Sequence, residues 1–202
     1  KLNKNTAFEI SIEELSINSA TMDDVDEVLN FASVDVETTV VLRNGNSLEG
    51  VNLKYEFSTS TDMDFVAGYD ANSTTTEKIK RSQDLKITGE KNVLGDDASQ
   101  DAVNVNDVSS LLRLVSNADQ GDAYTYISSD VDGDGVINVN DVSVLLRVVS
   151  KADTAAVQWK FVENDHDTLL SISKSSVAYS NGVELQTSGD SSTELMAILV
   201  GD

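Results

Sequence analysis

The sequence predicts a mainly β protein, an antiparallel β-sandwich interrupted by a small helical insertion. Three observations lead to this prediction. Apolar and polar residues alternate with the period of β-strands on both sides of the middle of the chain. A segment near the middle occurs twice, with apolar residues at helical spacing in both copies. An aspartate-rich stretch of the kind that binds hard cations directly precedes the second copy.

Strand-like alternation comes first in the N-terminal part of the chain. Strands are expected at residues 8–12, 34–42, 51–57, 63–66 and 85–87. Residues 21–31 fit either a single helical turn or a loop, and residues 70–76 are expected to form a polar loop.

Strand character resumes after the insertion. Strands are expected at residues 157–161, 169–172, 183–185 and 195–200, with a turn at Asn181-Gly182. Residues 154–202 alone supply only about three or four strands, close to the lower limit for an independent sandwich. Residues 1–92 and 154–202 are therefore predicted to form one discontinuous domain of about eight or nine strands, with residues 93–153 inserted in an exposed connection.

The inserted segment contains an internal duplication. Residues 104–119 align with residues 138–153 and differ only at Ser110/Val144, Leu114/Val148 and Asn117/Lys151. Each copy has an apolar stripe that predicts an amphipathic helix, formed by Val108, Leu111, Leu112 and Val115 in the first and by Val142, Leu145, Leu146 and Val149 in the second. The segment of residues 122–129 is too short, and its composition too mixed, to predict a comparable helix that enters the aspartate-rich stretch.

The aspartate-rich stretch, residues 130–141, predicts a calcium site. Asp130, Asp132 and Asp134 place three carboxylates so close together that they repel one another unless a hard cation lies between them. Gly135 stands at the sixth position, where an EF-hand loop turns sharply. The remaining expected ligands are the carbonyl of Val136, the side chain of Asn138, directly or through water, and the carboxylate of Asp141. A solvated Asp/Gly turn is the alternative, but such a turn does not require the asparagine or the final acid.

The corresponding loop of the first repeat predicts a second and weaker calcium site. The alignment places Asp96 at the first position, but Ala98 at the third and Asp101 at the sixth, so one carboxylate and the turn glycine are missing. The expected ligands are Asp96, Asn104 and Asp107, with Asp97 or Asp101 as substitutes.

Composition excludes several classes of function. A formal charge of −21, from 35 acidic and 14 basic residues, repels nucleic acid and anionic membranes. The absence of cysteine excludes disulfides and thiolate metal sites, and no apolar run has the length of a membrane span. Because the chain begins with Lys1 rather than methionine, we expect it to be a fragment of a longer protein.

Catalysis finds little support in the sequence, and we expect no enzyme. His166 is the single histidine, and no nucleophile arrangement accompanies it. With so many acids, carboxylate pairs of the kind that hydrolyse glycosides occur by chance. Trp159 alternates with Val157 and Phe161, which is more typical of a sandwich core than of a sugar platform.

Two loop-and-helix repeats joined by a short connector resemble the dockerin module of cellulosome-type assemblies, across residues 93–153. The flanking β segments resemble a cohesin, the sandwich that receives dockerins. That resemblance rests on VETTVVLRNGNSLEGVNLKYEF, VQWKF, SISKSSVAYSNGVELQ and ELMAILVGD. An immunoglobulin-like or carbohydrate-binding sandwich has a similar pattern.

The dockerin resemblance implies a calcium-dependent scaffolding module of an extracellular or cell-surface bacterial complex that degrades polysaccharide. Its partner is then a cohesin- or dockerin-bearing protein, and the near-identity of the two repeats implies docking in two orientations. The implied contacts are Val105, Asn106, Arg113, Val139, Asn140 and Arg147; the family's pattern also includes Leu112, Asn117, Leu146 and Lys151, but the apolar stripe already explains the two leucines. Two alternatives stay open: a carbohydrate-binding sandwich with a calcium-stiffened insertion, and self-association through the sandwich of one copy and the insertion of another.

Overall fold

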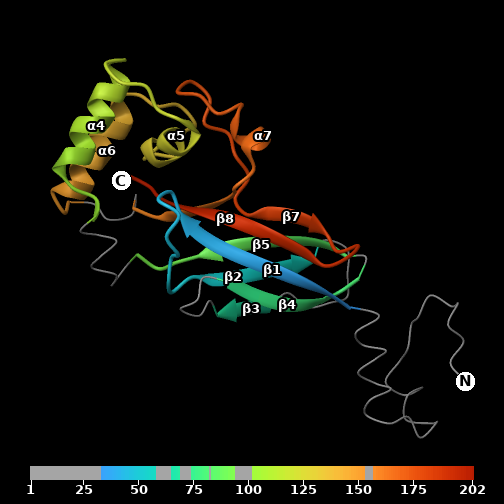
Figure 1. Cartoon of the computed structure of the whole chain (residues 1–202). Coiled ribbons are helices and arrows are strands. Elements are labelled where there is room, and N and C mark those ends of the chain that lie inside the picture. Colours follow the sequence, from blue (N-terminus) through green and yellow to red (C-terminus); the bar gives the residue numbers. More distant parts are fainter. Residues whose placement is uncertain (1–32, 58–64, 69–73, 82, 94–101, 153–156) are drawn as a thin grey trace, which may run out of the picture.

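Two four-stranded sheets form the β part of the protein (Figure 1). The computed structural model describes residues 33–57, 65–68, 74–81, 83–93, 102–152 and 157–202. The first sheet has the order β4 (Thr74–Lys80), β1 (Ser33–Leu42), β8 (Ser191–Leu199) and β6 (Trp159–Glu163). The second has the order β3 (Phe65–Gly68), β2 (Asn52–Phe57), β5 (Asp84–Glu90) and β7 (Val183–Gln186).

The two sheets share one apolar core. Val36 of β1, Leu195 of β8, Leu53 of β2 and Ile87 of β5 are fully buried in it. The alternation seen in the sequence explains why, because the odd and even residues of a strand point to opposite faces. The packing is tight where the ring of Phe161 of β6 lies against Gly89 of β5. Because residues of both sheets share this core, the two sheets form a sandwich.

One strand pair departs from the predicted antiparallel arrangement. β1 and β8 run parallel, with Val36 opposite Ser191 and Leu42 opposite Ala197. The other pairs of the two sheets in the described part of the chain are antiparallel. The first sheet therefore contains both parallel and antiparallel pairs, because the first and last described strands run through it in the same direction.

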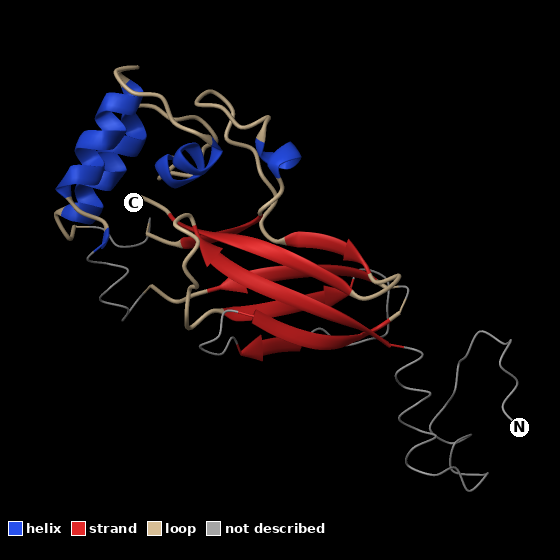
Figure 2. Ribbon diagram, in the orientation of Figure 1, coloured by secondary structure: helices blue, strands red, loops and turns tan. Residues whose placement is uncertain are grey.

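The helical region lies between β5 and β6 in the chain, as predicted, and Figure 2 shows its helices grouped beside the sheets. It contains α4 (Val105–Val115), α5 (Ala123–Ser129) and α6 (Val139–Val149), with α4 and α6 side by side. A fourth helix, α7 (His166–Leu169), follows β6. No helix in the described ranges has both the length and the apolar character needed to cross a membrane.

β8 connects the two parts because both of its faces are buried. Leu195 and Ala197 belong to the core between the sheets, whereas Met196 and Ile198 belong to a second core shared with the helical region. A strand covered on both faces reads as a continuous apolar run rather than an alternation. The run at the end of the sequence therefore reflects the helices packed against the outer face of this sheet.

The structure corrects three of the predicted elements. Thr74–Lys80 is strand β4, so the predicted loop at residues 70–76 ends earlier; three successive threonines favour extended backbone. Residues 169–172 are not a strand, because Leu169 ends α7 and a turn follows. A short helix, α5, does lead into the aspartate-rich loop; the side chain of Asp122 caps the N-terminus of this helix.

Several predictions lie outside the described residues. These are the strand at residues 8–12, the turn or loop at residues 21–31, and most of the first repeat's loop, including Asp96, Asp97 and Asp101.

Candidate metal centre

Three carboxylates converge in the loop between α5 and α6. One carboxylate oxygen from each of Asp130, Asp132 and Asp134 lies within 4.8 Å of the others. The backbone folds tightly enough for this because Gly133 and Gly135 adopt positive φ angles of 74° and 82°, which side chains with a Cβ rarely allow. The structure thus brings together the three acids that the sequence predicted.

The electrostatics of this cluster favour a bound cation. Burial raises the pKa of Asp130, and the charges of Asp132 and Asp134 raise it further, against the opposing hydrogen bond from the backbone N–H of Gly135. Asp130 is half-buried and Asp132 and Asp134 are exposed, and these three hard oxygen donors match the preference of calcium for carboxylate ligands. A divalent cation there would compensate the charges that otherwise repel one another.

Asp141, predicted as the last ligand, organises the loop from inside. Its side chain is fully buried. Its Oδ1 accepts hydrogen bonds from the backbone N–H groups of Val131 (2.9 Å) and Asp132 (3.2 Å), and its Oδ2 accepts one from Asn138 (2.8 Å). Burial raises the pKa of Asp141, and these N–H donors oppose the shift. It lies outside the three-carboxylate cluster, and its coordination of calcium stays a prediction.

The predicted ligands Val136 and Asn138 are engaged with the protein itself. The Asn138 side chain donates to the carbonyl of Val136 (3.0 Å), and its Oδ1 accepts from the backbone N–H of Asn140 (2.8 Å). Asn138 is thus the N-cap of α6, in a capping box with Asp141. The Asn-Val-Asn-Asp motif therefore starts the helix, whatever it contributes to metal binding.

The first repeat has the same cap. Asn104 accepts from the N–H of Asn106 (2.9 Å), and Asp107 accepts from the N–H of Asn104 (2.7 Å). Neither residue belongs to a cluster of three convergent ligands within the described part of the chain. Capping alone accounts for these two side chains, so the weaker calcium site stays a prediction.

The face predicted to bind a partner is exposed. Val105 and Val139 are each 62% exposed, and Asn106, Asn140, Arg113 and Arg147 are exposed as well. Leu112 and Leu146, which the apolar stripe assigned to the core, are 53% and 50% exposed. That assignment is wrong, because the buried stripe continues through Leu114 and Val148 instead.

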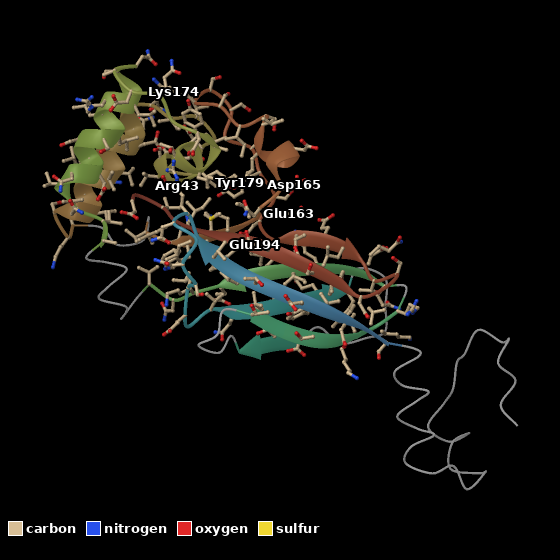
Figure 3. The ribbon with its side chains drawn as sticks, viewed as in Figure 1. Arg43, Glu163, Asp165, Lys174, Tyr179 and Glu194 are labelled. Carbon is tan, nitrogen blue, oxygen red and sulfur yellow. The ribbon has the colours of Figure 1, made fainter. Side chains whose placement is uncertain are left out.

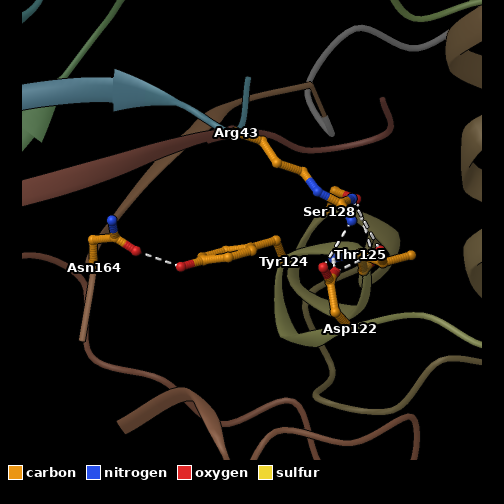
Figure 4. A network of polar contacts seen from close by, with 6 residues as sticks. All are labelled: Arg43, Asp122, Tyr124, Thr125, Ser128 and Asn164. Atoms are coloured by element: carbon orange, nitrogen blue, oxygen red, sulfur yellow. Dashed lines mark hydrogen bonds and ion pairs between the residues drawn. The ribbon is translucent and has the colours of Figure 1, made fainter. Parts of the chain in front are cut away.

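Contacts from the sandwich anchor α5 (Figure 4). Arg43, just after β1, pairs with Asp122 (2.7 Å) and donates to Thr125 (3.2 Å). Tyr124 donates to the side chain of Asn164, just after β6. The helix that leads into the aspartate-rich loop is therefore held by residues that directly follow two strands of the first sheet.

Sequence reasoning missed the contribution of residues 173–179. Lys174 and Tyr179 come from the β part of the chain but lie beside the helical region (Figure 3). Burial and the charge of Asp130 raise the pKa of Tyr179 to about 12. No spacing or motif in the sequence signals these contacts, because they join segments far apart in the chain.

The chain is thus a β-rich protein with two sheets and a helical region that carries a group of three convergent aspartates. Its comparison with models of protein families gave no match. Neither the curated proteins nor the solved structures contain a match to it.

Proposed function

We propose that this chain is a calcium-dependent protein–protein interaction module with a scaffolding role, in which a dockerin-like helical region is inserted in a cohesin-like sandwich. Its setting would be an extracellular polysaccharide-degrading assembly. It would bind proteins rather than turn over a substrate. Calcium would be held by Asp130, Asp132 and Asp134, with the remaining ligands from Val136, Asn138 and Asp141.

The observation that carries this proposal is the repeated apolar pair on the helices. Val105 and Leu112 of the first repeat correspond to Val139 and Leu146 of the second, and all four are at least half exposed. They make up most of the large apolar side chains exposed in the described part of the chain; the others are Val136 and Leu170. The two residues of each pair are seven positions apart, so they lie on the same side of their helix, and an exposed apolar helix face of this kind marks an interaction surface.

The charge on the same helices supports a protein partner. α4 and α6 each contain one acid, and those acids, Asp107 and Asp141, serve as caps at the helix start. Arg113 and Arg147 are their exposed charged residues, and Arg113 pairs with Asp119 through two hydrogen bonds of 2.6 and 2.9 Å. Each helix thus presents exposed apolar side chains beside an arginine, a residue type that is enriched in protein interfaces.

The rival proposal, a carbohydrate-binding sandwich, lacks an exposed aromatic platform among the described residues. Trp159 is partly buried and packs against both apolar cores. A ring in that position contributes to packing rather than to stacking on a sugar.

The test is calcium-dependent binding to isolated cohesin domains, measured by calorimetry. The double variant Leu112→Asp/Leu146→Asp should weaken binding by about tenfold or more, as expected for truncated hot spots. Either single variant should lose much less affinity for the cohesin domain, because the other repeat still presents its own exposed apolar pair. Leu170→Asp is the matched control, being 67% exposed but outside the helices.

Two results would contradict the proposal. One is binding that persists unchanged in chelator. The other is a double variant that behaves like the Leu170→Asp control. Sedimentation of the wild-type chain with and without calcium separately tests self-association, which predicts a calcium-dependent dimer or longer chain.

A further inference from the structure

Residues 173–179, here called the return segment, lie against the metal loop although they belong to the β part of the chain. The backbone N–H of Ile137 donates to the carbonyl of Lys174 (2.9 Å), and the N–H of Val177 donates to the carbonyl of Gly135 (2.8 Å). Ser173 and Ser176 close the return segment into a tight turn through two backbone hydrogen bonds. The loop and the return segment thus hold each other in register on both sides of Val136.

The return segment also reaches the first repeat. The Nζ of Lys174 donates to the carbonyls of Leu114 (2.9 Å) and Val115 (2.6 Å), and to Oδ1 of Asn117 (2.8 Å). These groups lie at the C-terminal end of α4, where carbonyls lack helical partners and a cation is favourable. One lysine therefore joins the end of α4 to the segment that borders the metal loop.

Apolar packing continues the same connection into the sandwich. Ile137 of the loop and Val177 of the return segment are buried in one core with Met196 and Ile198 of β8. The opposite face of β8 carries Leu195, which is buried in the core between the two sheets. Movement of the loop backbone would thus disturb a strand on which both cores depend.

We propose that the return segment couples calcium binding at residues 130–141 to the folding of the β-sandwich. In this view Lys174 and Val177 are positioning residues. They hold the loop backbone where its carboxylates converge, and calcium in turn stabilises the sandwich rather than the helices alone. The inference rests on the proposed calcium site and adds a thermodynamic linkage that crosses the boundary of the insertion.

Trp159 provides the readout for the intact 202-residue chain. It is the single tryptophan, it lies on β6, and it packs against both apolar cores, so its fluorescence follows the unfolding of the first sheet together with the core that this sheet shares with the helical region. When the free calcium concentration is about 1,000-fold above Kd, linkage predicts that the midpoint temperature of the thermal transition seen by Trp159 is about 10 °C higher than in chelator. Calorimetry on the same samples measures calcium affinity independently.

Lys174→Met is the decisive variant. Methionine keeps the backbone carbonyl that accepts from Ile137 but removes the Nζ contacts that fix the return segment on the end of α4. Loss of a positive charge should by simple electrostatics tighten calcium binding, whereas loss of these anchoring contacts should weaken it. We expect affinity to fall by about fivefold or more, the lower end of typical coupling between sites. Lys160→Met is the control, since it removes the same charge from β6.

A backbone variant tests the same linkage by another route. Val177→Pro removes the N–H that donates to Gly135, and Val177→Ala keeps it while shortening the side chain. We expect Val177→Pro to weaken calcium binding beyond the loss seen with Val177→Ala. If Val177→Pro does not fold, the Lys174→Met comparison decides the inference.

The outcomes separate this inference from the proposed function. Wild-type protein that binds no calcium overturns both. Calcium binding that leaves the Trp159 transition unmoved overturns the linkage alone, as does a Lys174→Met variant that binds as tightly as Lys160→Met or more tightly.

Discussion

Asp141→Ala should destabilise the calcium-free protein far more than Asp107→Ala, although the two aspartates occupy equivalent positions in the repeats. Asp141 is fully buried and accepts three backbone hydrogen bonds. Asp107 is partly exposed, and its side chain accepts one hydrogen bond, from the N–H of Asn104. The comparison thus holds the helix cap constant and varies what the carboxylate does inside the loop.

The expected magnitude follows from the groups left without partners. Alanine at position 141 leaves three N–H groups, those of Val131, Asp132 and Asn138, and each costs about 1–3 kcal/mol where it stays buried. Removing a carboxylate whose pKa burial raises returns part of that cost. We expect a net loss of roughly 2–5 kcal/mol for Asp141→Ala, against about 1 kcal/mol for the loss of a helix cap in Asp107→Ala.

Urea unfolding in chelator, followed by Trp159 fluorescence, measures both losses as free energies of unfolding. The slope of free energy against urea should be unchanged, so that the midpoints report stability. Equal losses for the two variants would refute the reasoning, since they would mean that the hydrogen bonds inside the loop add nothing beyond the cap.

Three further predictions concern other parts of the molecule. Because burial and like charges raise the pKa of Asp130, its ionisation costs stability above that raised pKa; Asp130→Asn should therefore be more stable than wild type in chelator at pH 7 and should bind calcium more weakly. The advantage should vanish as pH falls through the raised pKa, and urea titrations that show a constant difference would contradict this. Lys151→Gly should stabilise by about 0.5–1 kcal/mol in thermal unfolding, because Lys151, just after the C-cap of α6, has a φ of 58°, which favours glycine; no gain would contradict the strain. Gly89→Val should cost about 1–3 kcal/mol, since a Cβ there would lie 2.4 Å from the ring of Phe161, whereas Gly189→Val, with nothing within 4 Å, should be neutral; similar losses by calorimetry would argue against overpacking.

Much of the fold could be predicted from local pattern. Val34, Val36 and Val40 of β1 and Leu53 and Tyr55 of β2 are buried as the alternation indicated, whereas Leu42 and Phe57 at the strand ends are only partly buried. The duplicated motif predicted α4 and α6, and Asn104 and Asn138 begin them as caps. These features depend on neighbours within a few residues, so the sequence carries them directly.

Other features escaped because they depend on partners distant in the chain. A helix with apolar residues on more than one side does not say which side is covered, so Leu112 was assigned to the core in place of Leu114. β4 is polar along most of its length and becomes a strand by pairing with β1. The parallel pairing of β1 with β8 joins the two ends of the described chain, and no local pattern encodes it.

The candidate site divides in the same way. Spacing alone identified Asp130, Asp132 and Asp134, because a loop that closes around a cation must supply its oxygens at short, regular intervals. Only the tertiary structure brought Lys174 and Val177 to that loop, and only it exposed the apolar pairs on α4 and α6. The sequence by itself thus identified most of the strands, the two repeated helices and the acidic loop, since those depend on short-range geometry. Which faces are buried, and what the loop touches, was decided when β8 was covered on both sides, since burial is a property of the whole packed chain.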